Sequence, residues 1–261
     1  MGPASGSRDG SREDEGETSA VPDEIQRITD HETQVWSQLH HPKIVEMIEV
    51  MDVEDATFIV SELMGGGCLL TYIRQKGVLP ELEAKMLFRQ VATAVHYLHS
   101  DVRLIHRDLK CENVLLDETR TVAKIADFGL SQFLHPPVPE VGGATTHGTG
   151  DDPFCQGSLH YCAPEELAQT DKHTPASDIW SLGCILYAML TGELPFSDDF
   201  LPRLQARIVQ GKYDEQPLVT AGVSESAQSL VRAMLTVDTA SRASAAAVLT
   251  HPWLQFPSGL S

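Results

Sequence analysis

The stretch His106-Arg107-Asp108-Leu109-Lys110-Cys111-Glu112-Asn113 restricts the fold and chemistry of this chain more than any other. It places a carboxylate, a cation and a carboxamide on one short segment, at Asp108, Lys110 and Asn113. Phosphoryl transfer needs groups of these kinds, because a carboxylate accepts the proton of an incoming hydroxyl, a cation neutralises charge on the phosphate, and a carboxamide oxygen holds Mg²⁺. The stretch therefore predicts phosphotransfer chemistry.

Further motifs follow this stretch in a fixed order. They are Asp127-Phe128-Gly129, Ala163-Pro164-Glu165, the segment SDIWSLGCILYAMLTGELPF at 177–196, and Asp238 with Arg242. Together with HRDLKCEN they make the chain resemble a eukaryotic protein kinase domain of the Ser/Thr type, most like the calcium/calmodulin- and AMP-activated-kinase-like group. The resemblance covers roughly residues 31 to 254. One such motif is weak, whereas five in order are specific.

The resemblance implies an α+β fold, a two-lobed protein-kinase-like domain with a partial N-lobe sheet and a complete helical C-lobe. We expect a disordered, acidic, Gly/Ser-rich N-terminus at 1–24, since this segment has almost no apolar residues. The kinase domain is expected at 25–254, with the partial N-lobe at 25–64 and the C-lobe at 68–254. Residues 255–261 are expected to form a C-terminal tail.

The resemblance also implies the activity and the site. The expected reaction transfers the γ-phosphate of Mg-ATP to Ser or Thr of protein substrates, so the cofactors are ATP and Mg²⁺. The implied catalytic residues are Asp108, Lys110, Asn113, Asp127 and Ser158. The implied nucleotide-binding residues are Glu62, Met64, Leu115, Lys110, Asn113, Asp127 and Glu32, with Asn113 and Asp127 as the metal ligands.

The upper lobe departs from the family pattern. Kinases have three strands before the helix that corresponds to the one with Glu32 here. These strands supply a Gly-rich loop and a lysine that pairs with the glutamate of that helix. Here no lysine precedes Lys43, and the glycines at 2, 6 and 10 do not form GxGxxG. We therefore expect a truncated or fragmentary kinase. The alternative is a pseudokinase-like scaffold with little phosphotransfer. The intact Asp108, Asn113 and Asp127 favour the enzyme.

Two features bear on substrate and regulation. Cys68 and Ala188 stand where related kinases often have acidic substrate contacts, while Glu112 remains. A modest preference for a basic residue upstream of the target hydroxyl follows. Asp151 and Asp152 lie just before the usual phosphothreonine position, and we hypothesise that they replace its charge. The alternative is a solvated acidic loop.

The hydrophobic pattern predicts the main elements. We expect a helix from Glu24 to Leu39, strands at 44–51 and 57–63, a buried helix at 179–190, and helices at 224–235 and 243–249. Pro80 suits the first turn of a helix whose buried stripe is Leu87, Val91, Val95 and Leu98. By resemblance, Met47, Trp36, His106 and Phe128 form a stack, and Glu165 pairs with Arg242.

Composition excludes some functions. The net charge of −18 argues against sequence-independent nucleic-acid binding, which needs clustered Lys and Arg. The longest apolar run, 179–190, is too short to span a bilayer, so we expect no membrane partner. The five scattered cysteines suit a reducing compartment, which favours the cytoplasm, with the nucleus as an alternative. The oligomeric state is left open.

Overall fold

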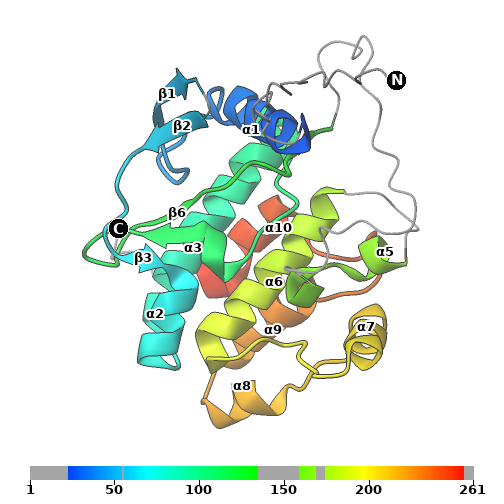
Figure 1. Cartoon of the computed structure of the whole chain (residues 1–261). Coiled ribbons are helices and arrows are strands. Elements are labelled where there is room, and N and C mark those ends of the chain that lie inside the picture. Colours follow the sequence, from blue (N-terminus) through cyan, green and yellow to red (C-terminus); the bar gives the residue numbers. More distant parts are fainter. Residues whose placement is uncertain (1–22, 55, 135–158, 169–173, 256–261) are drawn as a thin grey trace, which may run out of the picture.

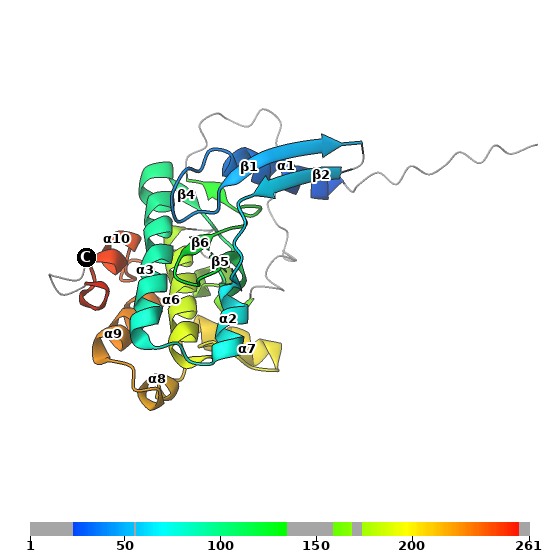
Figure 2. The same cartoon turned by 90° about the vertical axis from the view of Figure 1, so that its left-hand side faces the viewer.

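The computed structural model describes residues 23–54, 56–134, 159–168 and 174–255 (Figure 1). Its upper part consists of α1 (Asp23–Trp36) and an antiparallel hairpin of β1 (Met47–Val53) and β2 (Ala56–Ser61). The lower part is mainly helical (Figure 2). Nearly all of the predicted disordered segment at 1–24 lies outside the described residues.

The lower part contains eight described α-helices, three short 3₁₀ turns and small strands. The helices are α2 (Leu69–Lys76), α3 (Glu81–Tyr97), α5 (Pro164–Leu167), α6 (Pro175–Thr191), α7 (Leu201–Val209), α8 (Gln216–Thr220), α9 (Glu225–Met234) and α10 (Ala245–Thr250). A π-helical turn, Leu98–Val102, extends α3, and the 3₁₀ turns are Cys111–Asn113, Leu159–Tyr161 and Pro252–Leu254. The strands are β3 (Gly67–Cys68), β5 (Val114–Leu116) and β6 (Ala123–Ile125) in one antiparallel sheet, and β4 (Leu104–Ile105) with β7 (Gln132–Phe133) in another.

Helix α6 is the centre of the hydrophobic core. Every residue from Ser177 to Leu190 is buried, which confirms the central helix predicted from an almost wholly apolar segment. Helices α3 and α9 pack against α6, and α10 packs against α3 (Figure 2). The predicted stripe of α3 is confirmed, since Leu87, Val91, Val95 and Leu98 are each at most 1% exposed. None of the described helices has both the length and the apolar character needed to cross a membrane.

Several predicted boundaries are wrong. The second strand ends at Ser61 and not at residue 63, and the last helix is Ala245–Thr250 and not 243–249. The first helix ends at Trp36, not at Leu39, because Gln38 and Leu39 donate their N–H groups to carbonyls three residues earlier and so leave the α-helical pattern. The first strand begins at Met47, not at residue 44, because Val45 instead donates its N–H to the carbonyl of Ile125 at 2.9 Å. Pro80 caps α3 from outside its first turn. Leu39 is nevertheless buried, as the pattern predicted.

Candidate active site

The segment that carries Asp108 connects β4 to β5 and is fixed from below by Asp178, in the first turn of α6. One oxygen of Asp178, Oδ2, accepts the N–H of His106, and the other, Oδ1, accepts the N–H of Arg107, each at 2.9 Å. Arg107 has a positive φ of 70°, a conformation that a non-glycine residue rarely adopts without such support. Asp178 therefore holds the backbone that presents Asp108.

The charge of Asp178 is itself compensated. The side chain is 2% exposed, and burial on its own would raise the pKa. The opposing contacts, chiefly His99 Nε2 at 2.7 Å and the backbone of His106, hold the pKa below its ordinary value. Sequence reasoning missed the roles of Asp178 and His99. The available signal was a single acidic residue in the first turn of an otherwise apolar helix.

Four of the five predicted catalytic residues converge. Lys110 Nζ lies 2.5 Å from Asp108 Oδ2. The carboxamide Nδ2 of Asn113 donates to the same Asp108 oxygen at 3.0 Å and to Asp127 Oδ2 at 3.2 Å. Two carboxylates, one cation and one carboxamide thus face one another from two separate segments. The fifth residue, Ser158, lies outside the described residues, as do Asp151 and Asp152.

The carboxylate of Asp127 is the part of the cluster to compare with a cation ligand. Its carboxylate is exposed, and its φ of 69° places the residue in the left-handed region. Gly129 donates its N–H to Asp127 Oδ1 at 3.3 Å, which orients the carboxylate. Asp127 and Asn113 supply the carboxylate and carboxamide oxygens that Mg²⁺ prefers. The donor set therefore fits the metal implied by the resemblance.

The connection between the two parts of the molecule runs through Glu62 and Met64. The carboxylate of Glu62 lies 2.5 Å from Lys124 Nζ and accepts the N–H of Glu46 at 2.8 Å, so this side chain anchors the connection. Part of the backbone here is also engaged, since Glu62 donates its N–H to the carbonyl of Glu46 at 3.0 Å and the carbonyl of Met64 accepts the N–H of Gly67 at 3.3 Å. Leu115, half-buried in β5 opposite Cys68, lies below the connection.

Glu32 on α1 faces the segment that begins at Asp127. Burial first, and then the charge of Asp127, raise the pKa of Glu32, while a hydrogen bond with the backbone of Phe128 opposes the shift. Two lysines that could be considered as substitutes for the missing one are engaged elsewhere. Lys43 Nζ donates to Gln90 Oε1 at 2.7 Å, and Lys85 lies over the ring of Trp253.

Three of the four residues of the predicted stack contact one another. The ring centroids of Trp36 and Phe128 are 6.1 Å apart, and those of Phe128 and His106 are 5.1 Å apart. Met47 packs half-buried against the same core. The size of Trp36 has a structural reason, because its indole N–H donates to the carbonyl of Val45 at 2.6 Å. The stack therefore links α1 to the segment of Asp108.

The predicted pair of Glu165 and Arg242 is also present. Arg242 donates through Nη1 and Nη2 to the two carboxylate oxygens of Glu165, at 2.7 and 2.9 Å, and both side chains are buried. Arg242 also donates to the carbonyls of Thr236 and Ala176. This bidentate contact ties α5 to the connection between α9 and α10.

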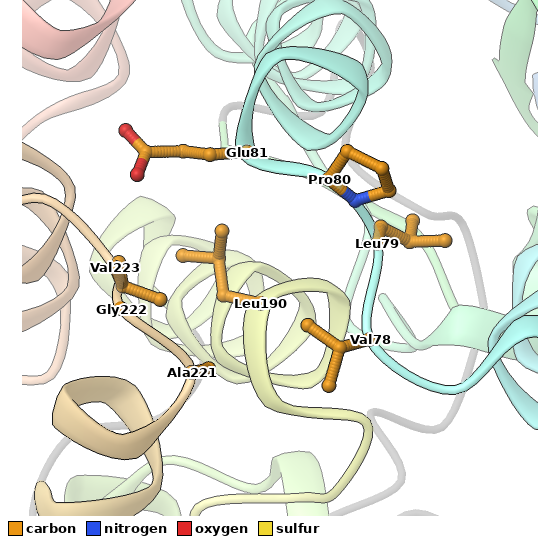
Figure 3. A pocket seen from close by; sticks show the side chains of 8 residues that line it. All are labelled: Val78, Leu79, Pro80, Glu81, Leu190, Ala221, Gly222 and Val223. Carbon is orange, nitrogen blue, oxygen red and sulfur yellow. The ribbon is translucent and has the colours of Figure 1, made fainter.

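One cavity, of about 230 Å³, lies beside the start of α3 and the end of α6, away from the catalytic residues (Figure 3). Val78, Leu190 and Val223 supply apolar walls. Figure 3 shows the carboxylate of Glu81 directed away from them. That carboxylate accepts hydrogen bonds from Ser224 and from the indole of Trp253, so it joins helices and does not serve the cavity.

Comparison with known proteins gives a consistent result. A family model described as "Protein kinase domain" matches residues 15–254. The chain is 36% identical over 224 residues to serine/threonine-protein kinase SIK1 of Mus musculus, covering 86% of this chain and 26% of that protein. It is 35% identical over 231 residues to the probable serine/threonine-protein kinase MARK-A of Dictyostelium discoideum, covering 88% and 20%. The chain thus spans a fifth to a quarter of the length of these relatives.

Solved structures resemble the described fold. The crystal structure of the Rad53 kinase domain and SCD2 aligns with a TM-score of 0.74 at 31% identity, covering 88% of this chain and 78% of that one. The same domain in complex with AMPPNP aligns with a TM-score of 0.71 at 30% identity, covering 89% and 82%.

Proposed function

The chain belongs to the protein kinase family, and we propose that it transfers the γ-phosphate of ATP to serine or threonine hydroxyls of proteins. The family, the two-lobed α+β fold and the Ser/Thr type predicted from the sequence are confirmed by the relatives and the aligned structures. The single observation that carries the proposal for this chain is the convergence of Asp108, Lys110, Asn113 and Asp127.

The geometry supports a division of roles. Asp108 accepts the proton of the substrate hydroxyl. The oxygen of that hydroxyl forms a bond to the γ-phosphorus, and the bond between the γ-phosphorus and the oxygen that bridges to the β-phosphate breaks. Lys110, beside Asp108, neutralises charge on the transferring group. Asn113 and Asp127 would hold Mg²⁺, which supplies charge neutralisation to the phosphates when bound.

The nucleotide base is proposed to meet the backbone of Glu62 and Met64, with Leu115 as an apolar floor. The contacts of the Glu62 carboxylate with Lys124 and Glu46 support this role, because they hold the backbone of the connection in one position. Glu32 is proposed to be the partner of the lysine that related kinases use to align the phosphates, and the 261 residues contain no lysine before Lys43 to fill that place.

The partners are proposed to be proteins with accessible Ser or Thr. We propose cytoplasmic localisation, with the nucleus as the alternative. The four described cysteines, Cys68, Cys111, Cys162 and Cys184, are free thiols, which is compatible with a reducing compartment.

The proposed activity can be tested directly. The purified 261-residue chain is incubated with Mg-ATP and a peptide that has one serine, and the phosphopeptide is measured by mass spectrometry. Asp108→Asn should lower the rate by a factor on the order of 10²–10⁴, since it removes the proton acceptor. Glu193→Gln, an exposed carboxylate at the far end of α6 from Asp178, is the matched control and should leave the rate unchanged. Equal rates for the Asp108→Asn variant and the wild type would refute the assignment.

A further inference from the structure

A second cavity, of about 540 Å³, lies beside α7 and is distinct from the catalytic cluster. Three cations contribute to its lining, namely Arg203, Arg207 and Lys212, together with Tyr213 and Asp214. Arg203 and Arg207 are one helical turn apart, so both side chains lie on the same face of α7.

The turn after α7 brings the third cation to the same place. Gly211 has a φ of 62°, and a Cβ at this position would lie 2.5 Å from the side chain of Val237, so glycine is favoured here. The turn is closed by the N–H of Lys212, which donates to the carbonyl of Arg207 at 2.9 Å. Lys212 therefore follows directly upon the helix end that carries Arg207.

The wall of the cavity is held by the core. The ring of Tyr213 packs edge-on against Tyr187 at 5.8 Å and against Phe196 at 5.9 Å. The hydroxyl of Tyr187 donates to the carbonyl of Asp214 at 2.8 Å. A site built on such a fixed wall loses little conformational entropy when it binds a ligand.

The cations retain donors for a ligand. Within the described part of the chain, Arg203 Nη1 donates to Asp198 at 3.3 Å and Arg207 Nη1 donates to the carbonyl of Ser197 at 3.0 Å. These contacts use Nη1 of each guanidinium group and do not use Nε or Nη2. The carboxylate of Asp214 accepts the N–H of Gln216, which directs it to the start of α8. Among the residues that line the cavity, three are cations and one, Asp214, is a carboxylate.

We propose that this cavity binds an acidic peptide segment of a partner protein, whose glutamate or aspartate side chains meet Arg203, Arg207 and Lys212. Guanidinium groups bind carboxylates through paired hydrogen bonds, and the volume suits one or two side chains rather than a folded surface. Phe200, 57% exposed and next to Arg203, offers an apolar contact for the flanking peptide. The binding does not depend on phosphotransfer.

The test uses the full 261-residue chain and a fluorescein-labelled octapeptide of alternating Glu and Ser, with fluorescence anisotropy as the measurement. The control peptide has Gln in place of each Glu. Wild-type protein should bind the Glu peptide, and raising the salt from 50 to 500 mM should weaken binding, because exposed charges are screened. The double variant Arg203→Gln/Lys212→Gln should weaken binding by about fivefold to tenfold.

Arg74→Gln is the matched control protein, since Arg74 is an exposed cation in the last turn of α2. It should bind the Glu peptide as the wild type does. Equal binding of the Glu and Gln peptides would overturn the proposal, as would no measurable binding of the Glu peptide, or an equal loss in the Arg74→Gln protein. Thermal unfolding of each variant, followed by circular dichroism, should match the wild type, so that a loss of binding reports the site.

Discussion

Asp178 shows how a residue without a chemical role can determine the position of Asp108. Its carboxylate is buried, and an unpaired buried charge would be strongly destabilising. Here His99 and the backbone N–H groups of His106 and Arg107 all contact it, so the charge is compensated. The same contacts support the positive φ of Arg107. Stability and the geometry of the site therefore depend on the same carboxylate.

Asp178→Asn should destabilise the chain by about 2–4 kcal/mol. The substitution replaces one carboxylate oxygen with an NH₂ group, which cannot accept a hydrogen bond, so one of the two backbone N–H groups loses its acceptor. Urea unfolding of the two proteins at neutral pH measures the difference. Asp101→Asn, an exposed residue of the π-helical turn, is the control and should change stability by less than about 0.5 kcal/mol. A loss at Asp178 no larger than at Asp101 would contradict the assigned role.

The effect of Asp178 should depend on pH in a defined direction. The pKa of this group is lower in the folded chain than in the unfolded chain, so the unfolded chain takes up the proton at the higher pH. The stabilisation is complete above the ordinary aspartate pKa of about 3.9 and is lost as the pH falls through the folded value. The stability gap between wild type and Asp178→Asn should therefore narrow below about pH 4. Urea unfolding at pH 7, 5 and 3.5 measures it, and a gap that widens with acid would refute the sign.

Glu112 should give the site a modest substrate preference. Its side chain is exposed, with the hydroxyl of Tyr161 3.5 Å from one oxygen, whereas Ala188 is 5% exposed within α6 and offers no charge. We expect selection for arginine three residues before the target hydroxyl, worth roughly 1.5–3 kcal/mol if the contact is well desolvated. A peptide array measures this, and Glu112→Gln should abolish the preference. Strong selection for arginine two residues before the hydroxyl would contradict the prediction.

At the scale of elements, buried contacts between distant segments hold the lower part together. Glu165 at the start of α5 and Arg242 before α10 are 77 positions apart in the sequence, yet they form two parallel hydrogen bonds. Arg242 also lies over the ring of Trp180 on α6 at 5.1 Å. One side chain thus connects three elements.

The losses of stability from removing the two partners should not be additive. Glu165→Gln or Arg242→Met alone should cost about 3–5 kcal/mol, because each leaves a buried charge without its counter-charge. The double variant should cost less than the sum of the two. Urea unfolding of the four proteins gives the coupling energy. Additive losses would show that the pair contributes no interaction of its own.

Local patterns were sufficient to predict some of these elements but not others. The spacing of Leu87, Val91 and Val95 predicted the buried face of α3, because a helical period is visible within one segment. The pairing of Val45 with Ile125, which moved a strand boundary, joins segments 80 positions apart and leaves no periodic trace. At the site, the motif residues were predicted by resemblance, while the contact between Lys124 and Glu62 was missed for the same long-range reason.

At the scale of the whole molecule, the two parts differ in how well they bury their apolar residues. The lower core is closed around α6. In the upper hairpin, by contrast, Ile48, Met51, Val53 and Phe58 are 41–63% exposed. Among the described strands β2 pairs only with β1, so its other edge has unpaired backbone groups (Figure 2). Four of the predicted catalytic residues thus converge in the lower part, while the described strands of the upper hairpin pair only with each other.

The 261-residue chain should therefore bind Mg-ATP weakly and transfer phosphate slowly. Its sequence contains no Gly-rich loop ahead of α1 and no lysine before Lys43 to pair with Glu32, and catalysis in this family depends on positioning of the phosphates. Loss of one preorganised donor of this kind costs on the order of 10²–10³ in rate. Adding the three strands that related kinases place before this helix should raise both ATP affinity and turnover.

Two chimaeras separate the effect of the missing strands from the effect of the missing lysine. One carries the added strands, and the other carries the same strands with their lysine replaced by methionine. Both should cover the apolar face of Met51 and Phe58, so both should bind less of the hydrophobic dye ANS than the 261-residue chain does. Only the chimaera with the lysine should phosphorylate a serine peptide rapidly, and Asp108→Asn should abolish that activity. If the 261-residue chain alone is as fast as the chimaera, the sheet and its lysine are not needed, and the alignment of the phosphates must come from residues already present in the described part of the chain.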